Sequence, residues 1–298
     1  RHRRKFDTTA TGREIMITSP TFTYLSINNY DIHVTEWGDA SNEVLVMWHG
    51  LARTGRDFDD LAMSLSDQYY VLCPDALGRG RSSWASDPQQ YSMPYYLHLA
   101  TALLDQYAIE QCHWLGTSLG GLIGMGLAAD PQQQRLRSLT INDIGPEIPA
   151  KGLNRILDYT VTMPRFKSIT EAECWLRNTY QSFGEAPDSY WQRMARTSVR
   201  RCHNGELSLH YDPAIVSQFP RPVSTISAWD TFTQIKLPTQ LFWGRQSDIL
   251  TEFIVDRMLS EMPSLDVTTF NDCGHAPNLT CAKSSQKLRH ILNKAAYS

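Results

Sequence analysis

A serine between glycines is the residue of this sequence best suited to act as a nucleophile. Residues 116–121 read Gly-Thr-Ser-Leu-Gly-Gly, which places Ser118 in a G-x-S-x-G pattern between a strand-like run and a helical segment. Such a tight strand-to-helix turn needs small residues two places before and after the nucleophile, and Gly116 and Gly120 fill them. The pattern predicts a strained Ser118 whose hydroxyl lies at the positive end of the helix.

A serine hydroxyl needs a base to become nucleophilic, and His275 is the predicted base. It lies in Cys-Gly-His-Ala-Pro, directly after the strand-like run 267–270, so we expect it on a loop at the carboxyl edge of the sheet. Among the nine histidines, His98 and His113 fall inside predicted elements. The placement therefore favours His275.

The base needs a carboxylate that orients it, and two aspartates follow predicted strands. Asp248 comes after Trp-Gly-Arg-Gln-Ser, and it gives the chain order Ser118, Asp248, His275. Asp143 is the alternative, because it ends another predicted strand at the same edge. We expect Asp248 to be the orienting acid and Asp143 to bind nearby backbone amides.

An oxyanion hole is predicted from backbone amides. His49-Gly50-Leu51 follows the strand-like run 43–48, so the chain can turn an amide toward Ser118. The donors would be the N–H groups of Leu51 and Leu119. We expect His49 to hold this loop in place and not to transfer protons.

Short apolar runs alternate with amphipathic helical segments along most of the chain. The run 43–48 is apolar on both faces, as in a strand buried within a parallel sheet. The alternation predicts an α/β fold, a mostly parallel sheet with helices on both faces, and it brings the strands' carboxyl ends to one edge, where ligands bind. A hairpin that turns at Asn28-Asn29 precedes it. The predicted strands are 22–27, 32–37, 43–48, 69–73, 113–115, 137–144, 240–243 and 267–270, and the predicted helices are 57–65, 95–107, 119–129, 252–262 and 284–292.

The alternation stops between residues 146 and 227, where helical patterns dominate and no convincing strand is found. Leu153, Ile156, Leu157 and Val161 share one predicted helix face, and 170–173 (Thr-Glu-Ala-Glu) forms a capping-box pattern. We interpret 146–227 as a helical cap on a core of 21–145 and 228–298, with a second packed domain as the alternative. Its aromatic residues either line a site for an apolar acyl group or form the cap's own core. They are Tyr159, Phe166, Trp175, Tyr180, Phe183, Tyr190 and Trp191.

The composition is that of a globular protein with a sizeable core, since 42% of the 298 residues are hydrophobic and 20% are charged. None of the six cysteines forms a C-x-x-C pair, so neither a metal nor another cofactor is expected. We expect mostly free thiols, with Cys73 and Cys112 buried in apolar runs. A bridge between Cys273 and Cys281 is left open.

The formal net charge of −3 gives no reason to expect nucleic-acid binding. The basic cluster at residues 1–5 is interpreted as part of an N-terminal tail, residues 1–20. No apolar run is long enough to span a bilayer, and no signal-peptide pattern is visible, so we expect a cytoplasmic protein without stable membrane insertion. Secretion after removal of a signal and the oligomeric state are left open.

Four motifs in this order, H-G-L, G-T-S-L-G-G, W-G-R-Q-S-D and G-H-A-P, resemble those of the α/β-hydrolase superfamily. Residues 75–82 are similar to the glycine-rich loop that these enzymes carry after their fourth strand, and the resemblance spans roughly residues 21–292. It implies an eight-stranded sheet, a helical cap after the sixth strand, and the roles assigned above. Capped esterases and C–C bond hydrolases are the most similar groups. Relatives that cleave haloalkanes or epoxides use an aspartate nucleophile, and Ser118 argues against both.

These features predict a serine hydrolase that cleaves a carboxylic ester of a small or medium apolar substrate through an acyl-enzyme. Hydrolysis of a C–C bond is the nearest alternative. A weakly catalytic ligand receptor on the same fold is the alternative from another class, and cofactor-free oxygen chemistry or perhydrolysis is a third.

Overall fold

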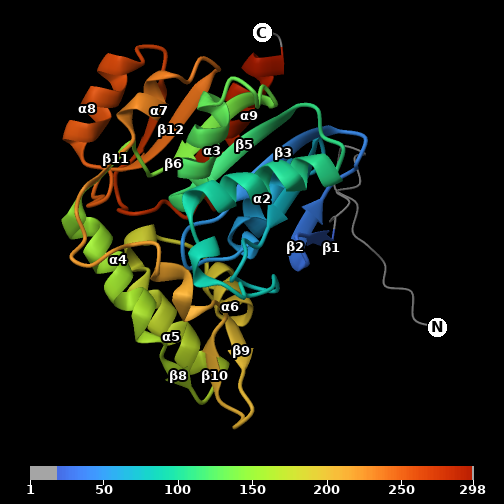
Figure 1. The fold of residues 1–298 in the computed structure, drawn as a ribbon, viewed down its shortest axis with the longest axis vertical. Helices are drawn as coiled ribbons and strands as arrows, with labels where there is room; N and C mark the ends of the chain where they lie inside the picture. The colour runs from blue at the N-terminus through green and yellow to red at the C-terminus, as the bar shows by residue number, and fades with distance from the viewer. Residues whose placement is uncertain (1–18, 297–298) are drawn as a thin grey trace, which may run out of the picture.

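A twisted sheet forms the centre of the protein in this computed structural model, which describes residues 19–296 (Figure 1). Within that range the main sheet has eight strands, and from β4 to β13 all neighbours run parallel. The predicted α/β architecture is confirmed. In spatial order the strands are β1 (Thr21–Ile27), β2 (Tyr30–Trp37), β4 (Tyr69–Pro74), β3 (Glu43–Trp48), β5 (Cys112–Thr117), β6 (Leu136–Asn142), β12 (Thr239–Gly244) and β13 (Asp266–Phe270).

The first two strands form the predicted hairpin at one edge of the sheet. Ile27 pairs with Tyr30 across a two-residue turn, and Asn28 and Asn29 both have positive φ, 52° and 65°. Asparagine tolerates this conformation better than most residues, which explains the tight turn. β2 also pairs antiparallel with β4, so the hairpin joins the parallel part of the sheet.

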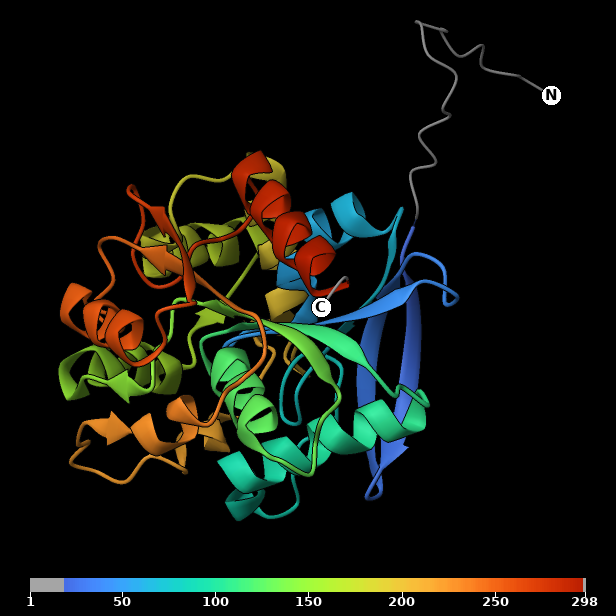
Figure 2. The ribbon, with the colours of Figure 1, turned by 90° about the horizontal axis from the view of Figure 1, so that it is seen from above.

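Helices cover both faces of the sheet, as Figure 2 shows. One buried cluster joins α1 and α9 to the first face, and a larger cluster joins α2, α3, α7 and α8 to the other. This two-sided burial explains why the central strands are apolar throughout. The helices are α1 (Asp59–Leu65), α2 (Met93–Gln106), α3 (Leu119–Ala129), α7 (Trp229–Thr233), α8 (Glu252–Glu261) and α9 (Ala282–Ala296), with the 3-10 turns η1 (Gly55–Phe58) and η2 (Pro88–Gln90).

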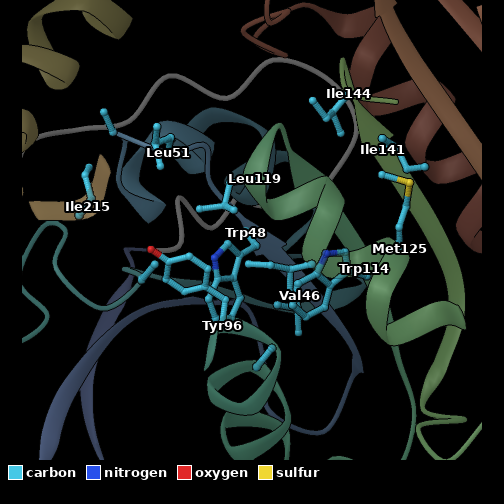
Figure 3. Packing of buried hydrophobic residues seen from close by; sticks show 14 of the residues in the cluster. Val46, Trp48, Leu51, Tyr96, Trp114, Leu119, Met125, Ile141, Ile144 and Ile215 are labelled. Atoms are coloured by element: carbon cyan, nitrogen blue, oxygen red, sulfur yellow. The ribbon is translucent and has the colours of Figure 1, made fainter. Parts of the chain in front are cut away.

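Two stacked tryptophans support the start of α3 from below (Figure 3). The rings of Trp48 and Trp114 lie 5.5 Å apart and are nearly parallel, and both are almost completely buried. The Trp114 indole N–H donates to the carbonyl of Gly120, at 3.0 Å. Large buried aromatic rings contribute strongly to packing, so this pair fixes the helix start against strands β3 and β5.

Much of the stretch between β6 and β12, residues 150–209, lies below the core in Figure 1. It is helical, as predicted, but it also contains short strands that the sequence did not reveal: β8, β10 and β9 form a small sheet, and β11 pairs with β7. Strands of two or three residues are too short to produce a recognisable alternation. Its elements are β7 (Glu147–Ile148), α4 (Ala150–Thr162), β8 (Arg165–Phe166), α5 (Ile169–Thr179), η3 (Gln181–Phe183), α6 (Asp188–Ser198), β9 (Val199–Arg201), β10 (Leu207–Leu209), η4 (Pro213–Val216) and β11 (Ile226–Ser227).

Two local predictions in this insertion need correction. Val161 is 48% exposed, and Thr160 lies on the buried face of α4 in its place, with its hydroxyl bonded to a backbone carbonyl one turn earlier. Helix α5 is capped by Ser168, which accepts the Glu171 amide at 3.1 Å, two positions before the predicted cap. The two predicted positions differ from the observed ones by only one and two residues, a shift that a helical pattern in the sequence does not resolve.

All six cysteines of the chain lie in the described part and are free thiols. Cys73 and Cys112 are buried in β4 and β5, as predicted, and no bridge joins Cys273 to Cys281. Between residues 19 and 296, no group of three or more histidine, cysteine or acidic side chains is arranged to hold a metal ion. No helix in this range has the length and hydropathy needed to cross a membrane. The basic cluster at residues 1–5, and most of the predicted tail, lie outside the described residues.

Candidate active site

The turn between β5 and α3 has the predicted strained geometry. Ser118 has φ 51° and ψ −112°, a backbone conformation that most residues avoid. A Cβ atom on Gly116 would lie 2.0 Å from the Gly120 carbonyl oxygen, and one on Gly120 would lie 2.0 Å from the Trp48 carbonyl oxygen. Only glycine fits at these two positions, which explains the spacing of the motif.

A chain of two hydrogen bonds leads from Ser118 into the protein. The Ser118 hydroxyl lies 3.0 Å from Nε2 of His275, and Nδ1 of the same ring lies 2.9 Å from an Asp143 carboxylate oxygen. Asp143 is fully buried, whereas the imidazole keeps slight exposure. An ionised Asp143 calls for the proton on Nδ1, so Nε2 is left to accept the serine proton.

The carboxylate that contacts His275 is therefore not the expected one. Asp248 does not hydrogen-bond His275; both of its oxygens accept from Arg155 of α4, each at 2.6 Å. Asp143 follows β6 and contacts His275, whereas Asp248 follows the neighbouring strand β12 and its carboxylate is bonded to Arg155 of α4. Two neighbouring parallel strands thus present an aspartate at the same edge, and the sequence order did not indicate which one would contact the histidine.

Three donors hold the Asp143 carboxylate in place. Besides His275, the Gly244 amide and the Ser247 hydroxyl donate to it, both at 2.6 Å. Complete burial raises the pKa of Asp143, and its hydrogen bonds with His275, Ser247 and Gly244 oppose that rise. The motif that ends in Asp248 thus contributes a different residue, Ser247, to this site.

The two predicted oxyanion donors lie next to Ser118. A Cβ atom on Gly50 would be 3.6 Å from that of Ser118, which shows how closely the loop after β3 approaches the serine. Leu119 is the first residue of α3, where the amide has no partner within the helix. Neither the Leu51 nor the Leu119 amide donates a hydrogen bond to any residue in the range 19–296, so both are available to a ligand.

His49 ties two loops together. Its Nε2 accepts the Ala76 amide at 2.9 Å, and its Nδ1 lies 2.7 Å from the Gly50 carbonyl oxygen. These partners require a neutral ring with the proton on Nδ1. Burial lowers the pKa of His49 to about 4, which favours this neutral form. The contacts agree with a role in holding the loop.

A cavity above Ser118 and His275 is lined in part by residues of the insertion. Its lining divides the predicted cap aromatics into two groups: Tyr159, Tyr180, Phe183 and Tyr190 reach it, whereas Phe166, Trp175 and Trp191 do not. The second group belongs to the buried core of the insertion. Arg53 and Asp57 also line the cavity, and the sequence analysis missed both because neither belongs to a motif.

Comparison with known proteins gives the family. A family model described as alpha/beta hydrolase fold matches residues 43–280, most of the chain. The chain belongs to the α/β-hydrolase family. Among curated relatives, a 3-hydroxybutyrate-oligomer hydrolase of Cupriavidus necator is 37% identical over 252 residues, which are 81% of this chain and 86% of the relative. The chain is a hydrolase of this family.

Two further comparisons extend the range of similar α/β hydrolases. A pimeloyl-[acyl-carrier protein] methyl ester esterase of Aeromonas hydrophila is 26% identical over 258 residues, 78% of this chain and 88% of that protein. The crystal structure of an α/β hydrolase from Novosphingobium aromaticivorans has a TM-score of 0.83 and 31% identity, covering 92% of this chain and 98% of that one. The similarity extends over most of the chain.

A buried arginine of this α/β hydrolase supports the loop that carries Leu51. Arg79 is inaccessible to solvent, and it donates to the Leu51 carbonyl at 2.8 Å and to the Tyr96 hydroxyl at 2.8 Å. Asp75, in the same glycine-rich segment, accepts from His33 at 2.9 Å and from two backbone amides. The sequence drew attention to this segment through its glycines, but it gave no sign of these two supporting roles.

The insertion also holds the loop that carries His275. Ser182 of η3 donates its hydroxyl to the His275 carbonyl at 2.7 Å, and its own carbonyl accepts the Gly274 amide at 2.7 Å. Asn278 donates to the Phe183 carbonyl at 2.9 Å. Sequence reasoning missed these contacts, because they join segments about 90 residues apart that no local pattern relates.

Proposed function

We propose that this hydrolase is a serine esterase in which Ser118, His275 and Asp143 form the catalytic triad. The observation that carries the proposal is the unbroken chain from the Ser118 hydroxyl through His275 to the buried Asp143 carboxylate. The two free amides beside the serine support the same chemistry. Asp248 is replaced in this role by Asp143, for the geometric reason given above.

Acylation begins with attack of Ser118 Oγ on the ester carbonyl carbon. His275 Nε2 takes the hydroxyl proton, and the Leu51 and Leu119 amides donate to the oxyanion that forms. The carbon–oxygen bond of the ester then breaks, and the alcohol leaves with the proton from His275. Asp143 stabilises the imidazolium throughout and is not itself protonated.

Deacylation repeats these steps with water. His275 takes a proton from the water that attacks the acyl-Ser118 carbonyl, and the same amides hold the second oxyanion. The carboxylic acid leaves, and His275 returns the proton to Ser118 Oγ. Losing either oxyanion donor would cost on the order of a hundredfold in rate.

We propose that residues 146–227 act as a cap on a core formed by 21–145 and 228–298. Support comes from the cavity lining, because Ile156, Tyr159 and Phe183 of this stretch face the same space as Ser118. The lining combines hydrocarbon and polar side chains, which suits a small or medium-sized ester. The name of the 37%-identical relative makes short 3-hydroxyacyl esters the first substrate class to test.

The test is turnover of p-nitrophenyl esters of graded acyl length by the wild type and by Ser118→Ala. We expect turnover of short acyl esters, its loss in the variant, and trapping of the acyl-enzyme at Ser118 by mass spectrometry. Turnover that survives in Ser118→Ala contradicts the proposed nucleophile. If the wild type hydrolyses no ester, the esterase proposal fails, and the ligand-receptor alternative becomes the one to pursue.

A further inference from the structure

Tyrosine hydroxyls without a partner lie in the cavity above Ser118. Among residues 19–296, no side chain or backbone group hydrogen-bonds the hydroxyl of Tyr159 or Tyr190, although both side chains line the cavity. Buried tyrosines away from the cavity differ: Tyr211 donates to the Thr160 carbonyl at 2.7 Å. Tyr190 is buried and Tyr159 is half-buried, but neither hydroxyl is among the fully enclosed polar atoms of the described residues, so both can donate a hydrogen bond to a ligand in the cavity.

A buried arginine lies beside these tyrosines in the lining of the cavity. Arg53 donates Nε and Nη2 to the Asp57 carboxylate, at 2.8 and 2.6 Å, and its guanidinium lies 5.0 Å from the ring centroid of Tyr180. Asp57 occupies two of the five N–H donors, and the Tyr180 hydroxyl interacts with the same guanidinium. Arg53 and the tyrosines can therefore still donate hydrogen bonds to a ligand, even though Asp57 balances the Arg53 charge.

The balanced charge of Arg53 and Asp57 decides which ligand these side chains suit. Arg53 is neutralised by Asp57, and the other described titratable side chains apart from the tyrosines that line the cavity are His275 and His49, whose ring burial keeps neutral by lowering its pKa to about 4. A free carboxylate would bring an uncompensated negative charge into a buried space, which is costly. A hydroxyl or carbonyl oxygen needs donors but no counter-charge, and it matches the available groups.

We propose that Arg53, Tyr159, Tyr180 and Tyr190, here called the polar wall, select esters whose acyl group carries an uncharged oxygen a few bonds from the scissile carbonyl, as in 3-hydroxyacyl esters. This inference rests on the proposed esterase function. Arg53 follows Leu51 by two residues, and its Cγ would lie 4.0 Å from a Cβ on Gly50. The wall thus begins beside the oxyanion loop, where the acyl carbons next to the carbonyl must lie.

The test compares two esters that differ by one hydroxyl group, p-nitrophenyl 3-hydroxybutyrate and p-nitrophenyl butyrate. The readout is the ratio of their kcat/KM values, so that general loss of activity or stability cancels. We expect the wild-type ratio to exceed one. Tyr159→Phe and Tyr190→Phe should each lower it by roughly threefold to tenfold, the effect of one lost hydrogen bond. Phenylalanine keeps the ring, whereas changing Arg53 would leave Asp57 buried and unpaired.

Tyr211→Phe is the matched control, because Tyr211 is a buried tyrosine of the same insertion that does not line the cavity. Its ratio should equal that of the wild type. A ratio that is unchanged in both cavity variants overturns the proposal, as does faster hydrolysis of p-nitrophenyl hemisuccinate, whose acyl group ends in a carboxylate. These outcomes are distinct from failure of the esterase proposal, in which neither ester is hydrolysed.

Discussion

Arg155 of the insertion and Asp248 of the core form a two-pronged ion pair, with both hydrogen bonds at 2.6 Å. The pair joins α4 to the loop after β12, on the outer side of the candidate site. Its side chains are 40% and 42% exposed, so water screens their attraction. Asp248 is thereby engaged in joining two layers of the molecule, and Asp143 alone contacts the histidine.

Exchange of each aspartate for asparagine separates these two roles. Asp143→Asn removes the negative charge that stabilises the His275 imidazolium and allows the wrong tautomer, so kcat should fall by about three to four orders of magnitude. Asp248→Asn keeps the triad intact and should lower kcat less than about tenfold. Steady-state kinetics on a p-nitrophenyl ester, with circular dichroism to verify folding, gives both values. Equal losses in the two variants would contradict the assignment of Asp143.

The stability effect of the ion pair should be small. Arg155→Ala removes a half-exposed pair, and such pairs contribute about 0–1 kcal/mol. Urea unfolding should therefore give a free energy of unfolding within about 1 kcal/mol of the wild-type value. Arg137→Ala, which breaks a similarly exposed pair with Glu43 far from the insertion, is the control. A much larger loss for Arg155→Ala alone would show that the insertion depends on this contact for its position.

Arg79 should affect catalysis through the oxyanion loop. Arg79→Met keeps much of the volume but removes the donor to the Leu51 carbonyl, so the Leu51 amide is held less firmly. We expect kcat to fall roughly tenfold with a smaller change in KM, because a misplaced oxyanion donor acts on the transition state. Stability should also fall by about 1–3 kcal/mol, since buried carbonyls lose their donor.

Stability measurements and the conservative variant make that prediction specific. Arg79→Lys retains the charge but not the fork of donors, and it should recover only part of kcat. If Arg79→Met is destabilised yet turns over substrate at the wild-type kcat, Arg79 supports the fold without positioning the oxyanion loop.

The acid side of the stability profile should depend on Asp75. Burial alone would raise the pKa of Asp75, but the hydrogen bonds and charges of His33, Arg81 and His49 lower it below 3.8 overall. A carboxylate with a depressed pKa stabilises the fold above the unfolded pKa, and this contribution is lost as the pH falls from about 3.8 through the folded value.

The corresponding experiment follows the free energy of unfolding from pH 6 to pH 3 in the wild type and in Asp75→Asn. The neutral amide cannot titrate, so the variant should be less stable at pH 6 and should show a shallower decline on acidification. Asp256→Asn, at an exposed position of α8 where the side chain has no hydrogen bond or ion pair to another described residue, serves as the control. Parallel profiles for the wild type and Asp75→Asn would contradict the role of Asp75.

Most of the fold and much of the site could be predicted from local patterns. The strained turn at Ser118, the histidine loop and the two amides depend on residues adjacent in sequence, where glycine spacing and strand ends are informative. The acid that contacts His275 could not be predicted from local patterns, because Asp143 and Asp248 both follow parallel strands. Only the pairing of β6 with β12 and the direction of the His275 ring distinguish them. The hydrogen bonds of Ser182 with the His275 loop, and the polar wall at Arg53, likewise depend on contacts between distant segments.

The stacked pair of Trp48 and Trp114 allows the turn at Ser118 to be observed by circular dichroism. Two indole rings at 5.5 Å and 18° are close enough for their electronic transitions to couple, and this coupling contributes to the near-ultraviolet circular dichroism of the protein. The pair contacts the start of α3 through the Gly120 carbonyl, so a displacement of the nucleophile's backbone alters the signal. If acylation of Ser118 shifts this backbone, we expect the circular dichroism of the unlabelled protein to change with it, even for substrates that have no chromophore.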